Sequence, residues 1–191
     1  MTSFRLNGVG RAALAIAGMS YPAVVYFGRS VVSSEAFIAA AVVIIGARVA
    51  TLTPAAARLW KRPLLIAVAG IILVAASSPA LAVKAYPVVL SLAAALAFGV
   101  TLISPPSLIE RFARLHDPEL SPAGQAYCRR VTWVWTCWLL INALIAGILG
   151  LSGHDAAWAL WTGFIAYLIM GGLFAGEFVV RQIVRGRVAP Q

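Results

Sequence analysis

The chain has 191 residues, of which 62% are hydrophobic and only 11% are charged. A soluble domain carries about 25% charged residues, so this composition excludes an ordinary cytosolic enzyme, a secreted disulfide scaffold and a disordered chain. The net charge of +9 suggests nucleic-acid binding in a soluble protein, but in a membrane protein it fits cationic loops held on the cytoplasmic side. We therefore predict an all-α, polytopic membrane protein with one domain over residues 1–191 and no nucleic-acid partner.

Six apolar segments follow one another, and each approaches the roughly 20 residues that a helix needs to cross the hydrocarbon core. In chain order, the predicted spans are residues 12–28, 36–52, 63–80, 86–104, 131–151 and 156–179. A signal peptide is the alternative for the first segment, because basic residues precede it. Its apolar run continues through Phe27, which favours an uncleaved span. The third and fourth spans are the least clearly divided, because only the stretch 79–87 separates them.

The placement of Lys and Arg tests this division independently, because these residues concentrate in short cytoplasmic loops. Six spans put both termini on one side, and twelve of the fifteen cations fall on that side: Arg5, Arg11, Arg58, Lys61, Arg62, Arg111, Arg114, Arg129, Arg130, Arg181, Arg185 and Arg187. Arg29 and Lys84 fall on the other side, and Arg48 lies within a span. We predict six spans with both termini in the cytoplasm.

The predicted cytoplasmic loop, residues 105–130, has internal order. Ser107 and Glu110 form the S-x-x-E pattern of a capping box at the start of a helix. Apolar side chains then share one helical face and charged ones share the other: Leu108, Ile109, Phe112 and Leu115 against Glu110, Arg111 and Arg114. We predict a short amphipathic helix lying flat on the inner leaflet, with Arg111 and Arg114 at anionic headgroups.

The end of the same loop predicts the start of the fifth helix. Ser121 is a favourable N-cap and Pro122 suits the first helical position, so this helix begins about two turns before it enters lipid. Arg129 and Arg130 then mark the inner headgroup level. They are either a topology signal or a binding site for a phosphate on a lipid or a carrier-linked substrate, since arginine binds phosphate with two parallel hydrogen bonds.

Polar groups inside the predicted spans call for an interpretation, because ionisable residues in lipid are costly. Arg48 lies near enough to the inner end of its span to snorkel, and Glu177 precedes Arg181 by four residues, the favourable order for a helical ion pair. A bond between Arg48 and Glu177 across the bundle is the alternative. Asn142 is predicted to hydrogen-bond a neighbouring helix rather than a ligand.

Small and aromatic residues predict how the last two spans are placed. Gly172 and Gly176 form a G-x-x-x-G pair with Tyr167 one turn earlier, which predicts that the sixth span packs inside the bundle. The tryptophans near the span ends are predicted to form interfacial belts, with an aromatic ligand platform as the alternative: Trp133, Trp135, Trp138, Trp158 and Trp161.

The chain lacks the usual signatures of catalysis and metal binding. Its two histidines, His116 and His154, lie in loops, and no P-loop, dinucleotide fingerprint or zinc-binding helix occurs. Cys128 and Cys137 are nine residues apart on opposite faces of one predicted helix, too far apart for a disulfide. We predict no metal and no cofactor. Catalysis by the loop residues Glu110, His116, Asp117 and Glu119 stays open, although a function other than catalysis is favoured.

Several stretches resemble a known family. They are Pro105 to Leu115, Tyr127 to Thr132 with Trp135 and Asn142, and Tyr167 to Glu177. These stretches resemble small polytopic inner-membrane proteins encoded in aryl polyene and xanthomonadin-type pigment clusters. The likeness covers residues 86–185; the first three spans are similar only in hydropathy. A weaker similarity, carried by the spacing of Arg130, Trp135 and Asn142, links the chain to the intracellular septation protein A family.

The first resemblance implies a Gram-negative host, the inner membrane and a role near polyene-lipid assembly, but no activity. It implies an acyl carrier protein, an acyltransferase, a glycosyltransferase or a lipid exporter as neighbours. We weigh three functions: a scaffold that docks such soluble partners through loop 105–130, a lipid-binding or lipid-translocating protein, and an enzyme acting on a lipid-linked substrate. The residues predicted to bind lipid or partner are Arg48, Glu110, Arg111, Arg114, Arg129, Arg130, Asn142, Tyr167 and Glu177.

Overall fold

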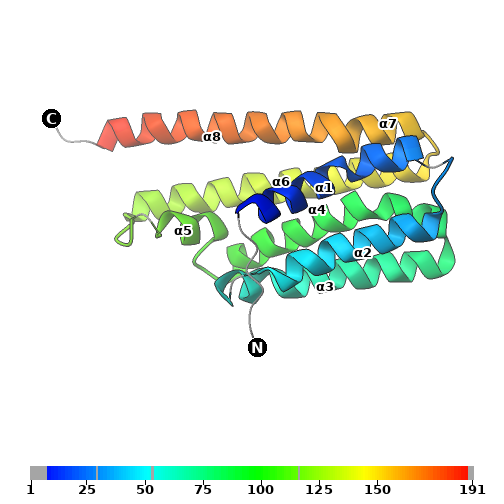
Figure 1. Ribbon diagram of the computed structural model, residues 1–191. Helices are drawn as coiled ribbons and strands as arrows, with labels where there is room; N and C mark the ends of the chain where they lie inside the picture. The colour runs from blue at the N-terminus through cyan, green and yellow to red at the C-terminus, as the bar shows by residue number, and fades with distance from the viewer. Residues whose placement is uncertain (1–7, 29, 53, 116, 189–191) are drawn as a thin grey trace.

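The computed structural model describes residues 8–28, 30–52, 54–115 and 117–188, and every regular element in these ranges is helical (Figure 1). In chain order the elements are α1 (Gly8–Gly28), α2 (Ser34–Ala50), α3 (Pro54–Ser77), α4 (Pro79–Ile103), α5 (Leu108–Ala113), α6 (Pro122–Leu151), α7 (Asp155–Leu160), the π-helical segment η1 (Trp161–Ile165) and α8 (Ala166–Val188). The all-α prediction is therefore confirmed.

Four stretches of helix in the described ranges are long and apolar enough to cross a membrane. They are Leu59–Ser77, Pro79–Ile103, Pro122–Leu151 and Asp155–Gln182, and they correspond to the last four predicted spans. α1 and α2, which match the first two predicted spans, are not among these four. α2 has 17 residues, a rise of about 26 Å, and this is slightly less than the roughly 30 Å of a hydrocarbon core.

Helix α4 is the centre of the bundle. It packs along both α3 and α6 and also touches α1, α2 and α5; Figure 1 shows it lying between α6 and α3. Alanines supply much of its buried surface, and Ala82, Ala93, Ala95 and Ala97 are each at most 4% exposed. Small side chains let helix backbones approach closely, so α4 can pack against α3 and α6 at the same time.

The first helix is attached to this bundle through Tyr21. Its hydroxyl lies 3.2 Å from the carbonyl oxygens of both Phe37 in α2 and Val83 in α4 and donates to them. Its ring packs on Tyr86 of α4 with the ring centroids 4.5 Å apart. Because water is absent from an apolar core, a buried hydroxyl must find its partner within the protein. Tyr21 therefore fixes α1 against two other helices.

Two helices begin before the predicted spans to which they correspond, and prolines lie within both. Predicted spans 63–80 and 86–104 begin beside prolines, but α3 runs through Pro63 and α4 runs through Pro87. Only Ser78 separates these two helices: its side chain accepts a 3.4 Å hydrogen bond from Leu81 N, and Pro79 takes the first helical position. An internal proline removes one backbone hydrogen bond, and packed membrane helices tolerate this loss.

The last span is divided by η1, and its second part departs from the prediction. The described part of α8 continues directly from η1 and makes few contacts with other helices. A methyl group added at Gly171, Gly172 or Gly176 would meet no atom within 4 Å. The prediction that Gly172 and Gly176 pack inside the bundle is therefore wrong, because such a pair permits close approach but does not supply a partner.

The tryptophans also differ from the predicted interfacial belts. Trp158 is 1% exposed and belongs to the core cluster, and Trp135 is 6% exposed. Trp161 donates a hydrogen bond to Asn142. These three positions correct the prediction, because the indole rings fill space between helices that a single sequence does not reveal. Trp133, which is 52% exposed, keeps the outward placement that was expected.

The role of Tyr21 can be tested by two substitutions. Tyr21→Phe keeps the ring and loses the hydrogen bonds, so we expect the free energy of unfolding to fall by about 0.6 kcal/mol. Tyr21→Ala also loses the ring, and we expect a fall of about 3–5 kcal/mol. Denaturant titration in detergent micelles measures both. Phe27→Ala, at a 79% exposed position of the same helix, is the control; an equal loss there would contradict the account.

Candidate functional site

The end of α4 is a polar junction that uses two of the predicted binding arginines. The last four carbonyls of a helix have no partner within it. Arg129 of α6 donates to Leu102 O at 2.8 Å. Arg111 of α5 donates to Pro106 O at 2.8 Å and Ser104 O at 3.3 Å. Arg111 and Arg129 therefore hold the chain together where α4 ends.

The start of α5 is fixed by side chains of three different elements. Leu108 N donates to the Thr101 hydroxyl of α4 at 2.8 Å, and Ile109 N donates to the Thr132 hydroxyl of α6 at 3.4 Å. Ser107 N donates to the Glu110 carboxylate at 3.3 Å, which is the acidic half of the predicted capping box. This short helix is thus joined to both α4 and α6.

Glu110 does not lie on the outer polar face that its sequence pattern predicts. It is 7% exposed, and one carboxylate oxygen accepts two hydrogen bonds from Arg114, at 2.8 and 3.0 Å. The other oxygen accepts from Ser107 N. Burial of a carboxylate is costly unless its oxygens are bonded, and both are bonded here. Phe112 and Leu115, predicted to face lipid, are exposed.

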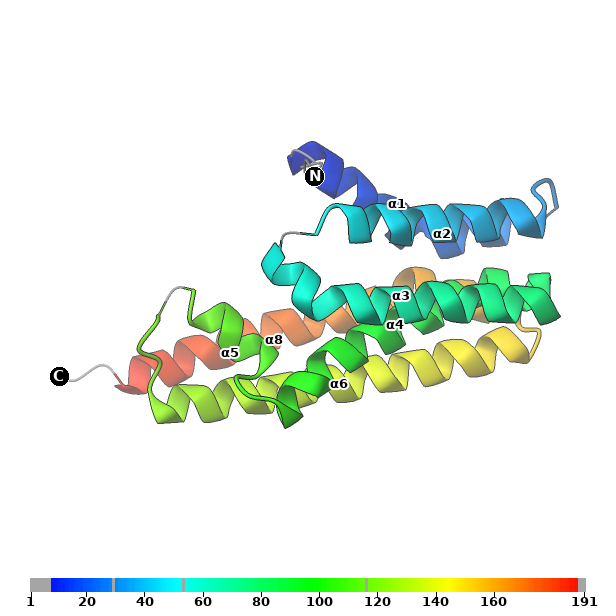
Figure 2. The same cartoon turned by 90° about the horizontal axis from the view of Figure 1, so that it is seen from below.

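Beyond η1, α6 and α8 approach each other only through long side chains. The rings of Trp135 in α6 and Phe174 in α8 lie 4.5 Å apart between their centroids. The Tyr127 hydroxyl donates to Glu177 O at 3.4 Å. In both views, α5, the start of α6 and the end of α8 lie at the same end of the bundle (Figures 1 and 2). These contacts hold the two helices apart and leave space between them.

That space is a partly open cavity of about 590 Å³, which we call the α6–α8 groove. Its lining is mainly apolar and comes from α5, the following loop, α6 and α8: Ile109, Phe112, Ala113, Asp117, Leu120, Ser121, Ala123, Gly124, Tyr127, Cys128, Val131, Trp135, Phe174, Glu177 and Arg181. Ligand sites are typically about 300–1,000 Å³, apolar, and provided with a few polar groups. We take this groove as the candidate functional site.

An ion pair lies at the polar end of the groove. Arg181 donates twice to one oxygen of Glu177, at 2.6 and 2.9 Å, and this pair confirms the prediction from the four-residue spacing. The Glu177 carboxylate therefore pairs along its own helix and not with Arg48. Asp117, from the loop after α5, adds an exposed carboxylate to the lining.

Three other predicted residues lie outside the groove. Asn142 donates to Ser91 Oγ at 2.9 Å and accepts from Trp161 Nε1 at 3.0 Å. This confirms the prediction of helix-to-helix hydrogen bonding. Arg48 and Tyr167 lie elsewhere in the bundle, where the Arg48 charge is within electrostatic range of the Tyr86 and Tyr167 hydroxyls. Of the nine residues predicted to bind lipid or partner, Glu177 is thus the one among the described lining residues of this groove.

Sequence reasoning missed the aromatic walls of the groove. Tyr127, Val131 and Trp135 follow one another at four-residue spacing on one face of α6, a stripe that indicates a shared helical face. The stripe alone does not distinguish a groove from a packed core. The sequence did not single out Phe174 as a lining residue, because almost every position around it is also apolar.

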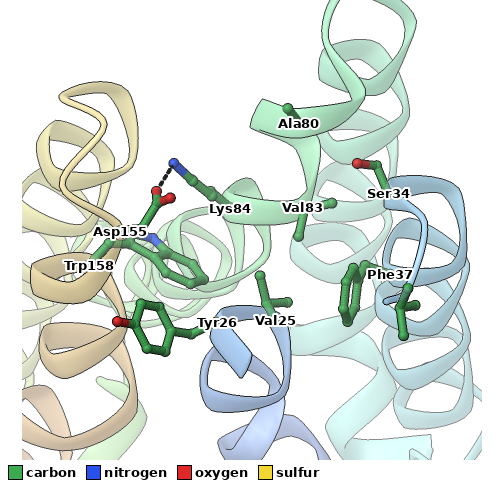
Figure 3. Close-up of a pocket in the computed structure, with 10 residues that line it drawn as sticks. Val25, Tyr26, Ser34, Phe37, Ala80, Val83, Lys84, Asp155 and Trp158 are labelled. Atoms are coloured by element: carbon green, nitrogen blue, oxygen red, sulfur yellow. Dashed lines mark ion pairs between the residues drawn. The ribbon is translucent and has the colours of Figure 1, made fainter. Parts of the chain in front are cut away.

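A second, smaller cavity lies at the opposite end of the bundle. It has a volume of about 210 Å³ and is lined by residues of α1, α2, α4 and α7 together with the loop before α2. Lys84 of α4 pairs with Asp155 of α7 at its edge, and Phe37 and Trp158 supply aromatic surface (Figure 3). The volume is about a third of that of the α6–α8 groove, so the larger site is the stronger candidate.

No protein-family model, no curated protein and no solved structure matches this chain. The resemblance to the pigment-cluster family therefore stays a prediction. Within the described ranges, no group of three or more His, Cys, Asp or Glu side chains is placed to hold a metal ion. Cys128 is buried and Cys137 is exposed, and both are free thiols, as their spacing predicted.

The neighbouring residues Arg129 and Arg130 provide a matched test of the polar junction. Arg130 is exposed and makes no hydrogen bond or ion pair among the residues that the structure describes. We expect Arg129→Gln to lower the free energy of unfolding by about 1 kcal/mol, because Leu102 O loses its charged donor. Arg130→Gln should change it by less than about 0.5 kcal/mol. Equal effects in denaturant titrations would contradict the assignment.

Proposed function

We propose that the protein binds the acyl chain of a membrane phospholipid in the α6–α8 groove. The observation that carries this proposal is the size and lining of the groove: about 590 Å³, walled by Trp135, Phe174 and Val131, with Glu177 and Arg181 following Phe174 toward the end of α8. An acyl chain is the apolar ligand that surrounds these helices in a bilayer. A groove with an apolar body and a polar end matches a chain joined to a headgroup.

The proposal includes a topology. We propose that α1 and α2 span the bilayer with the four longer helices, that both termini are cytoplasmic, and that the membrane is a bacterial inner membrane. The clustering of twelve cations on one side supports this orientation, and Tyr21 supports α1 as part of the bundle. The groove then lies at the cytoplasmic end, next to loop 105–130.

Docking of a soluble partner ranks below lipid binding on this geometry. Arg111 and Arg129 donate to the backbone where α4 ends, and Arg114 pairs with Glu110. Loop 105–130, through which docking is predicted, contains four arginines. Three of them are therefore engaged within the chain, and Arg130 remains. An acyl carrier protein, an acyltransferase, a glycosyltransferase or a lipid exporter stays a predicted neighbour through the family resemblance alone.

Lipid binding is tested by filling the groove. Val131→Trp places a bulky ring in the lining, and Val134→Trp makes the same change at a 52% exposed position of α6 outside it. Native mass spectrometry of the protein released from mild detergent counts retained phospholipids. We expect Val131→Trp to lose at least about four fifths of the lipid bound by the unsubstituted protein, and Val134→Trp to keep it. Equal amounts of retained phospholipid in the unsubstituted protein and both variants would contradict the proposal.

The topology is tested separately by labelling single cysteines in intact cells. With Cys128 and Cys137 replaced by serine, we expect Ser152→Cys, in the loop between α6 and α7, to react with a membrane-impermeant maleimide. Glu119→Cys, in the loop after α5, should react only after the inner membrane is opened. Labelling of Glu119→Cys in intact cells would contradict the orientation.

A further inference from the structure

The hydrogen bonds at the polar end of the groove leave one acceptor and one donor side by side. Arg181 directs Nε and one terminal nitrogen at a single oxygen of Glu177. A guanidinium has five N–H donors and a carboxylate has two oxygens. The second Glu177 oxygen, near which the Tyr127 hydroxyl lies, can therefore accept a further hydrogen bond, and the other terminal nitrogen of Arg181 makes no hydrogen bond with a described residue.

The charge of the described lining residues is negative. Asp117 and Glu177 are carboxylates, and Arg181 is the one cation among the lining residues that the structure describes. The nearby pair of Glu110 and Arg114 does not change this balance, because the two charges neutralise each other and both Glu110 oxygens are bonded. Arg181 compensates Glu177, so a headgroup that carries only negative charge would lie beside the uncompensated Asp117 carboxylate, which disfavours it.

We propose that the groove selects a zwitterionic phospholipid with a primary amine, which places its ammonium at the Glu177 carboxylate and its phosphate at Arg181; this inference rests on the proposed lipid-binding function. The ammonium donates to the second Glu177 oxygen, and Asp117 adds a second negative charge to the lining. The phosphate accepts from the Arg181 nitrogen that Glu177 leaves unused. Each ionic group of the lipid then meets its opposite.

The same geometry distinguishes an ethanolamine headgroup from a choline headgroup. Both carry one positive charge, but a primary ammonium donates three hydrogen bonds and a quaternary ammonium donates none. The Glu177 side chain is 18% exposed, so its oxygens are partly removed from water. A hydrogen-bond donor from the ligand therefore stabilises the carboxylate. A quaternary ammonium is typically held by a cage of aromatic rings, and among the described residues the one aromatic contact to the ion pair is the Tyr127 hydroxyl at Glu177 O.

The test is a competition between three lipids with identical acyl chains. The delipidated full-length protein is incubated with equimolar phosphatidylethanolamine, phosphatidylcholine and phosphatidylglycerol, and native mass spectrometry measures the bound fraction of each. We expect phosphatidylethanolamine to exceed each of the others by about five- to tenfold. Glu177→Gln should bring the ratio to phosphatidylcholine close to one, and Asp117→Asn should raise the share of phosphatidylglycerol.

Two features keep the outcomes distinct. Asp117 is an exposed loop residue whose side chain makes no hydrogen bond within the described ranges, so Asp117→Asn reports on charge even where Glu177→Gln fails to fold. Glu119→Gln, an exposed acidic position outside the lining, is the matched control and should leave all ratios unchanged. Equal binding of the three lipids, or preference for phosphatidylglycerol, overturns the headgroup inference and leaves lipid binding intact. Binding of none overturns the proposed function itself.

Discussion

Hydrocarbon offers no hydrogen bonds, so the backbone polar groups within the bundle must be bonded by the chain itself. This constraint is most visible where α4 ends. The carbonyls of Leu102 and Ser104 lie at a point where the backbone leaves the helix, and Arg129 and Arg111 donate to them. The hydroxyls of Thr101 and Thr132 accept from the start of α5. α5 is thereby fixed against α6, and it forms one wall of the groove.

The other wall depends on the path of the last helix. α7 is anchored by the buried Trp158, and η1 by the bond from Trp161 to Asn142. A π-helical turn inserts one extra residue into the helical repeat and often lies at functional sites. Beyond it, α8 keeps contact with α6 through Phe174 and Glu177. The groove exists because α8 is held at the distance that these side chains set.

Much of the architecture was predictable because it follows from local rules. Ser121 and Pro122 marked the start of α6, and the spacing of Glu177 and Arg181 gave the ion pair. The groove was not predictable in the same way. It depends on how helices distant in sequence approach each other, which decides that Glu110 is buried, that Gly172 is exposed and that Trp135 forms a wall. Because the chain is 62% hydrophobic, apolar periodicity does not identify which face of a helix meets a partner. The continuation of α3 through Pro63 and of α4 through Pro87 was not predictable for a related reason, since packing compensates the hydrogen bonds that these prolines remove.

The central claim is that the α6–α8 groove is a specific lipid-binding site and not a surface in non-specific contact with the lipid of the bilayer. Its most direct test is the stoichiometry of lipid that stays with the purified protein during stepwise exchange into a delipidating detergent, followed by native mass spectrometry. The account predicts a plateau at one phospholipid per chain that persists after all other lipid has been removed. A continuous decline to zero without a plateau would contradict it.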